Sequence, residues 1–251
     1  MTHELLTLRA ILLSGSPGDR DLFRQAASRI QVPVELLDTD SAAAASDGLI
    51  RGADLMFIDS GCSAAETARA VAAARGAAKP PFVILLAGQG GARVPQAADG
   101  VAARPVSFED TMRLIERTMR LRLPSRVLVV DDSATMRSIV RKTLGATRFP
   151  FEVTEAAEGL TALKLVGERQ FDVVFLDYNM PELNGLETLA EFKRQQRRVT
   201  VVMITSADDD SLVDRVRAQG AAFLKKPFFP ADIEAVLAGH YGLTALNPKR
   251  A

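Results

Sequence analysis

Phe171-Asp-Val-Val-Phe-Leu-Asp177 is an apolar run that ends in an aspartate, and the turn-rich stretch Tyr178-Asn-Met-Pro-Glu-Leu-Asn-Gly185 follows it directly. Because residues 173–176 are apolar without interruption, they predict a strand that is buried on both faces of a sheet. Such a strand delivers Asp177 to its carboxyl end, where open α/β sheets keep their binding sites. Taken alone, Asp177 is equally consistent with an aspartate that caps a helix at an ordinary joint between a strand and a loop.

The same pattern occurs earlier in the chain. Arg9-Ala-Ile-Leu-Leu-Ser-Gly-Ser16 aligns with Arg126-Val-Leu-Val-Val-Asp-Asp-Ser133, and Asp54-Leu-Met-Phe-Ile-Asp59 aligns with Asp172-Val-Val-Phe-Leu-Asp177. Arg104-Pro105 likewise falls near the counterpart of Lys226-Pro227. The length of 251 residues also exceeds the usual single-domain length of about 100–150 residues. The sequence therefore predicts one fold that is present twice.

Apolar, strand-like runs alternate with helical periodicity in both halves. These runs are residues 9–14, 34–37, 54–59, 82–87 and 100–103 in the first half, and 126–131, 151–155, 172–177, 199–205 and 221–224 in the second. Such alternation predicts a parallel sheet with helices on both faces. We therefore expect an α/β protein with two flavodoxin-like (βα)5 domains in tandem, each a five-stranded parallel sheet, at residues 1–122 and 126–245. The linker, about Leu123 to Ser125, is too short to let the domains move independently.

Segments between the strands carry helical or loop signals. Met136, Ile139, Val140 and Leu144 share one face of a helix predicted after strand 126–131, and another helix is predicted at 158–168. The alanine-rich runs 42–45 and 72–78 are also predicted to be helical. Gln89-Gly-Gly-Ala92 lacks the Gly-Lys-Ser/Thr ending of a phosphate-binding loop, so we expect a flexible loop there.

The composition is that of an ordinary soluble globular protein. Its 31 basic residues balance its 31 acidic residues, so the chain lacks the basic footprint of a nucleic-acid-binding protein. No apolar stretch approaches the roughly 18 residues that span a bilayer, and the N-terminus lacks the pattern of a signal peptide. The sequence predicts a cytoplasmic protein without nucleic-acid or membrane partners.

Cysteine and histidine offer little metal-binding or redox chemistry. Cys62 is the single cysteine, which excludes an internal disulfide and a cysteine-rich metal site. We expect Cys62 to be a small packing residue. His3 and His240 lie near the termini and share no motif with an acidic residue, so both are expected to be solvated.

Polar residues are predicted to converge in the second half. If its five strands run parallel, their carboxyl ends bring together Asp131, Asp132, Asp177, Thr205 and Lys226. Crowded carboxylates repel one another, and hard oxygen ligands of this kind suit Mg²⁺. An aspartate beside Mg²⁺ and the ammonium group of Lys226 is a nucleophile placed to attack phosphorus, because both cations neutralise charge on the transferring group. Thr205 offers a hydroxyl to the phosphoryl group after transfer.

These residues lie in motifs that resemble the response-regulator receiver family. The matching stretches are Val129-Val-Asp-Asp-Ser-Ala-Thr-Met-Arg137, Asp177-Tyr-Asn-Met-Pro181 with Asn184-Gly185, Met203-Ile-Thr-Ser206, and Phe223-Leu-Lys-Lys-Pro-Phe228. Residues 126–240 are similar in particular to the chemotaxis regulators of this family. The whole chain resembles a two-component response regulator with tandem receivers, in which a pseudo-receiver precedes a chemotaxis-regulator-like receiver.

The resemblance implies a role for each residue of the second half's site. Asp177 is then the residue that a histidine kinase or a phosphotransfer protein phosphorylates. Mg²⁺ is held by Asp132, by Asp177 and by the backbone carbonyl of Asn179, while Asp131 holds it mainly through water. Lys226 pairs with the phosphoryl oxygens or with the Asp177 carboxylate.

The resemblance also implies a conformational switch. Thr205 and Phe223 form the switch pair, in which Thr205 moves towards the new phosphoryl oxygens and Phe223 turns into the space it leaves. Phe223 lacks the hydroxyl of a tyrosine, so a hydrogen bond from this position is not expected. Of Lys225 and Lys226, the family pattern selects Lys226, which precedes a proline.

The first half departs from the family pattern. Alignment places Ser14-Gly15 at the acidic pair, Ala87 at the threonine and Arg104 at the lysine, so that Asp59 alone keeps its residue type. Without the acidic pair a Mg²⁺ ion loses most of its carboxylate ligands, and phosphoryl transfer to Asp59 should be slow or absent. This half resembles a degenerate receiver, and we expect it to mediate homodimerisation or an interdomain contact, or to act as an adaptor.

The leading hypothesis is a response regulator that accepts a phosphoryl group, is not an enzyme, and signals to a downstream protein by contact. After about residue 240 only a tail is expected, so the signal passes by contact or the chain is a fragment that lacks an effector. One alternative is a scaffold or adaptor that is never phosphorylated. Another is a Mg²⁺-dependent aspartyl-phosphate phosphotransferase, but Asn179 occupies the position where such enzymes carry a second acid.

Overall fold

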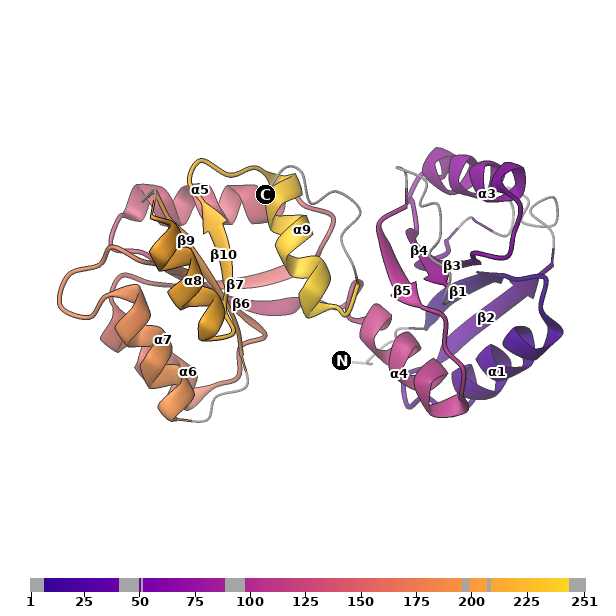
Figure 1. The fold of residues 1–251 in the computed structure, drawn as a ribbon, viewed down its shortest axis with the longest axis horizontal. Helices are drawn as coiled ribbons and strands as arrows, with labels where there is room; N and C mark the ends of the chain where they lie inside the picture. The colour runs from indigo at the N-terminus through magenta and orange to yellow at the C-terminus, as the bar shows by residue number, and fades with distance from the viewer. Residues whose placement is uncertain are drawn as a thin grey trace, which may run out of the picture. The chain divides into compact units, whose positions relative to one another are not determined.

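The computed structural model describes residues 7–40, 50, 52–88, 98–195, 199–206 and 209–243. Within these residues the chain forms two compact units, and Figure 1 shows a sheet with its helices in each. The first unit ends at Arg122, and the second runs from Leu123 to His240. Residues 241–243 group with the first unit, although they follow the last helix of the second.

The first unit is a five-stranded parallel sheet in the order β2-β1-β3-β4-β5. Its strands are β1 (Leu8–Leu13), β2 (Val34–Thr39), β3 (Leu55–Asp59), β4 (Phe82–Ala87) and β5 (Gly100–Ala103). Its helices are α1 (Pro17–Ala27), α3 (Ala64–Gly76) and α4 (Phe108–Met119). Helix α1 packs beside α4 on one face of the sheet, and α3 covers the other face (Figure 1).

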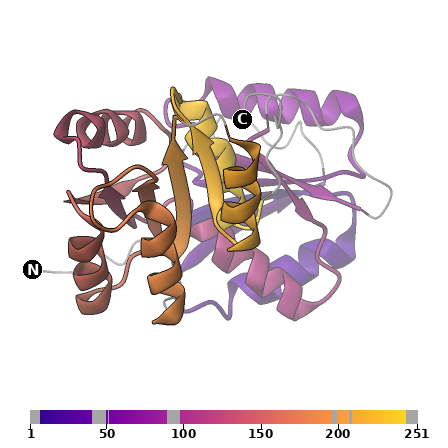
Figure 2. The ribbon, with the colours of Figure 1, turned by 60° about the vertical axis from the view of Figure 1, so that its left-hand side comes forward.

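The second unit repeats this topology in the order β7-β6-β8-β9-β10, again with all strands parallel. Its strands are β6 (Ser125–Val130), β7 (Phe151–Ala156), β8 (Val173–Asp177), β9 (Thr200–Thr205) and β10 (Ala222–Lys225). Its helices are α5 (Ala134–Gly145), α6 (Gly159–Glu168), α7 (Gly185–Arg194), α8 (Asp210–Ala218) and α9 (Pro230–His240). Figure 2 shows α8 on one side of β9 and β10 and α9 on the other.

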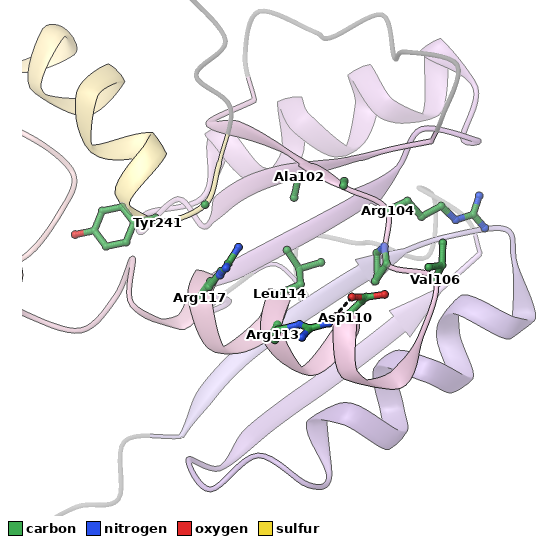
Figure 3. Close-up of a pocket in the computed structure, with 11 residues that line it drawn as sticks. Ala102, Arg104, Val106, Asp110, Arg113, Leu114, Arg117 and Tyr241 are labelled. Carbon is green, nitrogen blue, oxygen red and sulfur yellow. Dashed lines mark hydrogen bonds and ion pairs between the residues drawn. The ribbon is translucent and has the colours of Figure 1, made fainter. Parts of the chain in front are cut away.

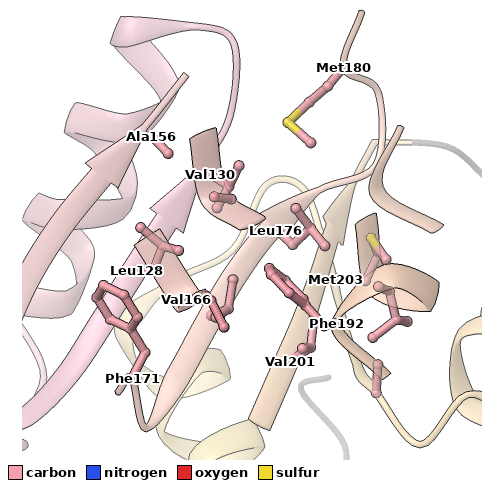
Figure 4. Packing of buried hydrophobic residues seen from close by; sticks show 14 of the residues in the cluster. Leu128, Val130, Ala156, Val166, Phe171, Leu176, Met180, Phe192, Val201 and Met203 are labelled. Atoms are coloured by element: carbon pink, nitrogen blue, oxygen red, sulfur yellow. The ribbon is translucent and has the colours of Figure 1, made fainter. Parts of the chain in front are cut away.

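The core of the second unit follows from the alternation of side chains along its strands. Leu128 and Val130 of β6, with Leu176 of β8, pack against apolar residues of α6, α7 and α8 (Figure 4). The intervening residues of the same strands are equally buried, and they face the side covered by α5 and α9. Because both faces are covered, the central strands read as continuous apolar runs, as the sequence predicts. The predicted flavodoxin-like fold is confirmed for both halves.

Each unit contains an equivalent polar contact at the start of its first strand. The Asp54 carboxylate accepts a hydrogen bond of 3.1 Å from the backbone N–H of Arg9, and Asp172 accepts one of 2.8 Å from Arg126. The next residues in each unit form the buried strands β3 and β8. Each aspartate thus satisfies a backbone donor at the start of the first strand, and the internal repeat extends to these contacts.

Some local expectations are wrong. Ile139 was placed on one face of α5 with Val140 and Leu144, but those two residues are fully buried and Ile139 is 43% exposed. Helix α3 ends at Gly76 with Ala77 in an extended conformation, so the predicted run 72–78 is helical only in part. His240 was expected to be solvated, but its Nδ1 lies 2.8 Å from the hydroxyl of Thr200. The strand β6 already begins at Ser125, which shortens the predicted linker.

Other expectations fall outside the described residues. These are the helical run 42–45, the loop Gln89-Gly-Gly-Ala92 and the solvated His3. Among the helices of the described part of the chain, none combines the length and the apolar character needed to cross a membrane.

Candidate functional site

The candidate site lies where the strands of the second unit end. Strand β8 ends at Asp177 and β9 at Thr205, while Asp131 and Lys226 directly follow β6 and β10. Since all five strands run parallel, these ends meet at one edge of the sheet. Strands β6, β8 and β9 are buried apolar runs, so each can present a polar side chain at its carboxyl end without interrupting the core.

Lys226 joins two buried carboxylates. Its Nζ lies 2.7 Å from Oδ1 of Asp177 and 3.1 Å from Oδ2 of Asp131. The exposed fractions are only 3% for Asp131 and 4% for Asp177. The second oxygen of Asp131 accepts a hydrogen bond of 2.9 Å from the backbone N–H of Ser133. One ammonium group therefore serves two carboxylates in a site largely shielded from water.

The pKa values of both Asp177 and Lys226 are raised, but for different reasons. Burial raises the pKa of the Asp177 carboxyl, the hydrogen bond and charge of Lys226 lower it, and the charge of Asp131 raises it again, so that the pKa is raised overall. Burial lowers the pKa of the Lys226 ammonium, but the bonds and charges of Asp177 and Asp131 outweigh it, and that pKa is also raised. The site therefore keeps Lys226 charged and still lacks positive charge for its carboxylates.

A divalent cation would supply the missing charge. Asp131, Asp132 and Asp177 each offer a carboxylate oxygen, and these atoms lie within 4.8 Å of one another. Asp132 is exposed, whereas the other two are buried. Hard oxygen donors with one side open to solvent suit Mg²⁺, which keeps several of its waters in proteins. The acidic cluster thus fits the predicted metal.

The strand register places the predicted switch residues. In the pairing of β10 with β9, Phe223 lies opposite Met203 and Lys225 lies opposite Thr205. Thr205 is fully buried, and Phe223 is partly buried against the core. The backbone N–H of Lys226 donates to the carbonyl of Thr205 over 2.8 Å. The threonine and the lysine are therefore held by adjacent strands.

Two supporting residues were not identified as site residues from the sequence. Arg137, on the first turns of α5, donates from Nη1 to the carbonyl of Asp131 over 2.8 Å and pairs with Glu155 over 3.1 Å. Gly185 approaches β8 so closely that an added Cβ would lie 2.5 Å from the carbonyl oxygen of Asp177. Both residues lie inside the motifs quoted for the second half, so their position in those motifs is the signal by which the sequence could have identified them.

In the first unit a different cluster occupies the equivalent edge. Arg104 pairs with Asp19 over 2.6 Å and with Asp59 over 3.6 Å. The Ser14 hydroxyl lies 3.2 Å from Asp19 and 3.3 Å from Asp59, which is 4% exposed. Arg20 donates to the carbonyl of Ser14 over 2.6 Å, as Arg137 does to that of Asp131. The scaffold of the site is kept, but a guanidinium group sits among the carboxylates.

Ser14, Asp59 and Arg104 therefore come together as the internal alignment indicates, whereas Asp19 was missed by the sequence analysis. Asp19 lies in the first turn of α1, beyond the aligned acidic pair. The remaining aligned positions, Gly15 and Ala87, offer no side-chain ligand. Ala87 is the last residue of β4, as Thr205 is of β9.

Comparison with known proteins identifies this architecture. The family model described as response regulator receiver domain matches residues 127–238, which contain the acidic cluster and Lys226. The chemotaxis protein CheY-3 of Vibrio cholerae is 33% identical over 115 residues, which cover 45% of this chain and 88% of that protein. The chemotaxis protein CheY of Bacillus subtilis is 34% identical over 104 residues, or 41% of this chain and 86% of the relative.

The similarity extends to other response regulators. The two-component response regulator ORR11 of Oryza sativa subsp. indica is 35% identical over 114 residues, covering 44% of this chain and 76% of that protein. A solved structure titled a probable two-component system response regulator/GGDEF domain protein matches with a TM-score of 0.50 and 21% identity. That match covers 93% of this chain and 97% of the other. At 21% identity it supports the fold and nothing further.

The second unit is thus a receiver domain of the kind found in two-component response regulators. The chain belongs to the response regulator receiver family, and its first unit repeats the receiver fold.

Proposed function

We propose that the second unit accepts a phosphoryl group on Asp177 from a histidine kinase or a histidine phosphotransfer protein. The observation that carries this proposal is the 2.7 Å contact between Lys226 and Asp177 inside the buried acidic cluster. The carboxylate is positioned by an ammonium group that can also meet the oxygens of an incoming phosphoryl group. The chain would then signal to a downstream protein by contact, as a phosphoacceptor and not as an enzyme.

The residues divide the chemistry between them. An Asp177 oxygen attacks phosphorus, so that an oxygen–phosphorus bond forms while the bond from phosphorus to the donor's histidine nitrogen breaks. Lys226 neutralises negative charge on the transferring group, and the buried surroundings strengthen that interaction. Asp132, with Asp131, Asp177 and the carbonyl of Asn179, would hold Mg²⁺. When bound, Mg²⁺ supplies further positive charge at the phosphoryl oxygens.

The response would begin at Thr205. Phosphorylation adds about −1.5 to −2 charges at Asp177, and the Thr205 hydroxyl at the end of the neighbouring strand would hydrogen-bond to the new oxygens. Phe223, partly buried on the adjacent strand β10, would repack in response. The surface formed by α8, β10 and α9 would then differ between the two states and be read by a partner.

The first unit would not take part in phosphoryl transfer. Its acidic pair is replaced by Ser14 and Gly15, and Arg104 already engages Asp19 and Asp59. A guanidinium group is permanently charged, so it offers the carboxylates an internal counter-ion in place of a metal. We propose domain limits of 1–122 and 126–245, with the first domain serving as a regulatory or dimerisation module in the cytoplasm.

The test is phosphoryl incorporation from acetyl phosphate with Mg²⁺, measured by intact mass on the full chain. The wild type and Asp59→Asn should each gain one phosphate, and Asp177→Asn should gain none. A phosphate that persists in Asp177→Asn and disappears in Asp59→Asn would reverse the roles of the two units. No incorporation by the wild type, with a Mg²⁺ titration to show that metal binds, would favour the unphosphorylated scaffold.

A further inference from the structure

Arg137 reaches back from helix α5 to the turn that carries two acidic residues of the candidate metal site. It is the fourth residue of α5, and its Nη1 donates to the carbonyl of Asp131 over 2.8 Å. The same Nη1 donates to the carbonyl of Asp132 over 3.4 Å. One guanidinium nitrogen therefore contacts the backbone of both residues without occupying either carboxylate.

Glu155 of strand β7 orients this guanidinium group. Its Oε2 lies 3.1 Å from Nε of Arg137, and its Oε1 lies 3.5 Å from Nε of Arg141, one helical turn further along α5. The side chain of Arg137 is only 16% exposed, so it has little freedom to turn away. A planar guanidinium group can donate from Nε to a carboxylate and from a terminal nitrogen to a carbonyl at the same time, and Arg137 does both.

The two acidic residues of the turn differ in how firmly they are held. Asp131 is buried, its backbone N–H donates to the carbonyl of Ala156 over 3.2 Å, and its carboxylate accepts from the N–H of Ser133. Asp132 is exposed, so the position of its side chain depends on the path of the backbone. The contact from Arg137 fixes that path at the carbonyl of Asp132.

The first unit contains the same arrangement of arginines and acid. Arg20, the fourth residue of α1, donates to the carbonyl of Ser14 over 2.6 Å and lies 3.6 Å from Asp38 of β2. Arg24 also pairs with Asp38, over 2.7 Å. The acid and its two arginines have the same spacing in both halves of the sequence. The internal repeat therefore includes this support of the turn.

The turn that Arg20 supports presents no carboxylate pair. Ser14 and Gly15 stand in place of the two acidic residues, and Arg104, which directly follows strand β5 (Figure 3), is the cation that pairs with Asp59. The first unit thus has the supporting arginine without the metal ligands, and it provides a matched control for the second.

We propose that Arg137, oriented by Glu155, is a positioning residue that places Asp132 for Mg²⁺. This inference rests on the metal site of the proposed function. Replacing a residue that orients a metal ligand typically costs about 10–100-fold in metal affinity. The charge of Arg137 acts in the opposite direction, because a positive group repels a second cation. Loss of Arg137 therefore weakens Mg²⁺ binding through lost positioning, whereas a role of its charge alone would make binding tighter.

Isothermal titration of the unphosphorylated full chain with Mg²⁺ tests this inference. Arg137→Ala should weaken the affinity about tenfold, although it removes a positive charge. Arg137→Lys keeps the charge but loses the fork of N–H donors, so it should also bind Mg²⁺ more weakly than the wild type. Arg20→Ala is the matched control and should keep the wild-type affinity. Unchanged or tighter binding by Arg137→Ala would overturn the inference.

Hydrogen exchange followed by mass spectrometry separates lost positioning from lost folding. Arg137→Ala should accelerate amide exchange at residues 131–133 several-fold, and Arg20→Ala should do so at 14–16, while the central strands β8 and β3 keep their rates. If β8 loses its protection in Arg137→Ala, the titration of Arg137→Lys decides, and wild-type affinity in that variant would overturn the inference.

The wild-type titration distinguishes failure of this inference from failure of the metal site itself. A wild type that binds no Mg²⁺ would overturn both. A wild type that binds Mg²⁺, with the same affinity in both variants of Arg137, would remove the positioning role and leave the metal site in place. Neither result depends on phosphorylation of Asp177.

Discussion

The ammonium group of Lys226 lies 2.7 Å from a carboxylate oxygen of Asp177, in a position that the guanidinium of Arg104 takes towards Asp59 at 3.6 Å in the first unit. The two cations differ in their other partner. Lys226 also contacts Asp131, a second acidic residue at a strand end, whereas Arg104 pairs with Asp19 on helix α1. An ammonium is a compact point charge on a flexible stem, and it can follow a new phosphoryl oxygen. The guanidinium group of Arg104 is already paired with Asp19 and Asp59.

Replacing Lys226 should therefore slow phosphorylation. Removal of one preorganised cationic donor costs about 10²–10³ in the rate of comparable reactions, so Lys226→Ala should reduce the rate of labelling by acetyl phosphate on that scale. Arg104→Ala is the matched control in the other unit and should keep the wild-type rate. Equal rates for Lys226→Ala and the wild type would remove Lys226 from the reaction.

Metal binding should depend on the exposed acid of the cluster. Isothermal titration of the unphosphorylated chain with Mg²⁺ should show one site, because a complete acidic cluster is expected in the second unit alone. Asp132→Asn should weaken the affinity about tenfold or more, since the charge of the ligands sets Mg²⁺ affinity.

Asp59→Asn serves as the control for the metal titration and should leave the affinity unchanged. An unaltered affinity in Asp132→Asn, or a second site lost in Asp59→Asn, would contradict the assignment of the metal to the second unit. The measurement reads binding directly and needs no phosphodonor.

The close approach of Gly185 to strand β8 predicts a stability difference between two glycines. In Gly185→Ala the new Cβ would meet the carbonyl oxygen of Asp177 at 2.5 Å and the sulfur of Met203 at 2.8 Å. Such overpacking costs about 1–3 kcal/mol or more. Gly145→Ala, in α5 with no atom within 4 Å of the added Cβ, should be neutral or stabilising by up to about 1 kcal/mol. Urea unfolding of both variants measures the difference, and similar midpoints would show that β8 yields to the methyl group.

Cys62 reports on the charge of Asp59. Burial raises the pKa of the Cys62 thiol above its ordinary value, and the nearby carboxylates of Asp59 and Glu66 raise it further. Because the thiolate is the reactive form, the rate of alkylation by iodoacetamide should reach its midpoint at a higher pH than for an ordinary exposed cysteine. Asp59→Asn removes one of the negative charges and should shift that midpoint to lower pH.

Asp210→Asn, in helix α8 of the second unit, is the control for the alkylation measurement and should leave the midpoint in place. Since the chain has a single cysteine, the modified site is unambiguous. A midpoint that stays or rises in Asp59→Asn would mean that Asp59 carries no negative charge beside Arg104.

The sequence predicts the strands and the convergence of the site residues in the second unit, because both follow from local patterns and from the parallel arrangement of the strands. Strands β3, β4, β6 and β8 are buried on both faces, so their apolar runs mark them with little ambiguity. Parallel strands share one carboxyl edge, and the approach of Asp131, Asp177 and Lys226 follows from that geometry. The roles of these residues in phosphorylation and metal binding remain proposals.

What the sequence did not predict depends on the exact directions of side chains. Asp19 reaches Arg104 because the first turn of α1 points it towards the sheet edge, and no spacing rule contains that direction. Ile139 satisfies the helical period of its neighbours, yet it lies at the border of the buried face. The contact of Leu243 with Gly100 joins segments that are far apart in the chain, which local patterns cannot indicate.

The order of synthesis gives that last contact a further meaning. A chain folds from its N-terminus as it leaves the ribosome, and domains generally fold as units during this process. Leu243 packs against Gly100, the first residue of β5, and it is translated only after the whole of the second unit. The first unit, which is made first, therefore gains this apolar contact last.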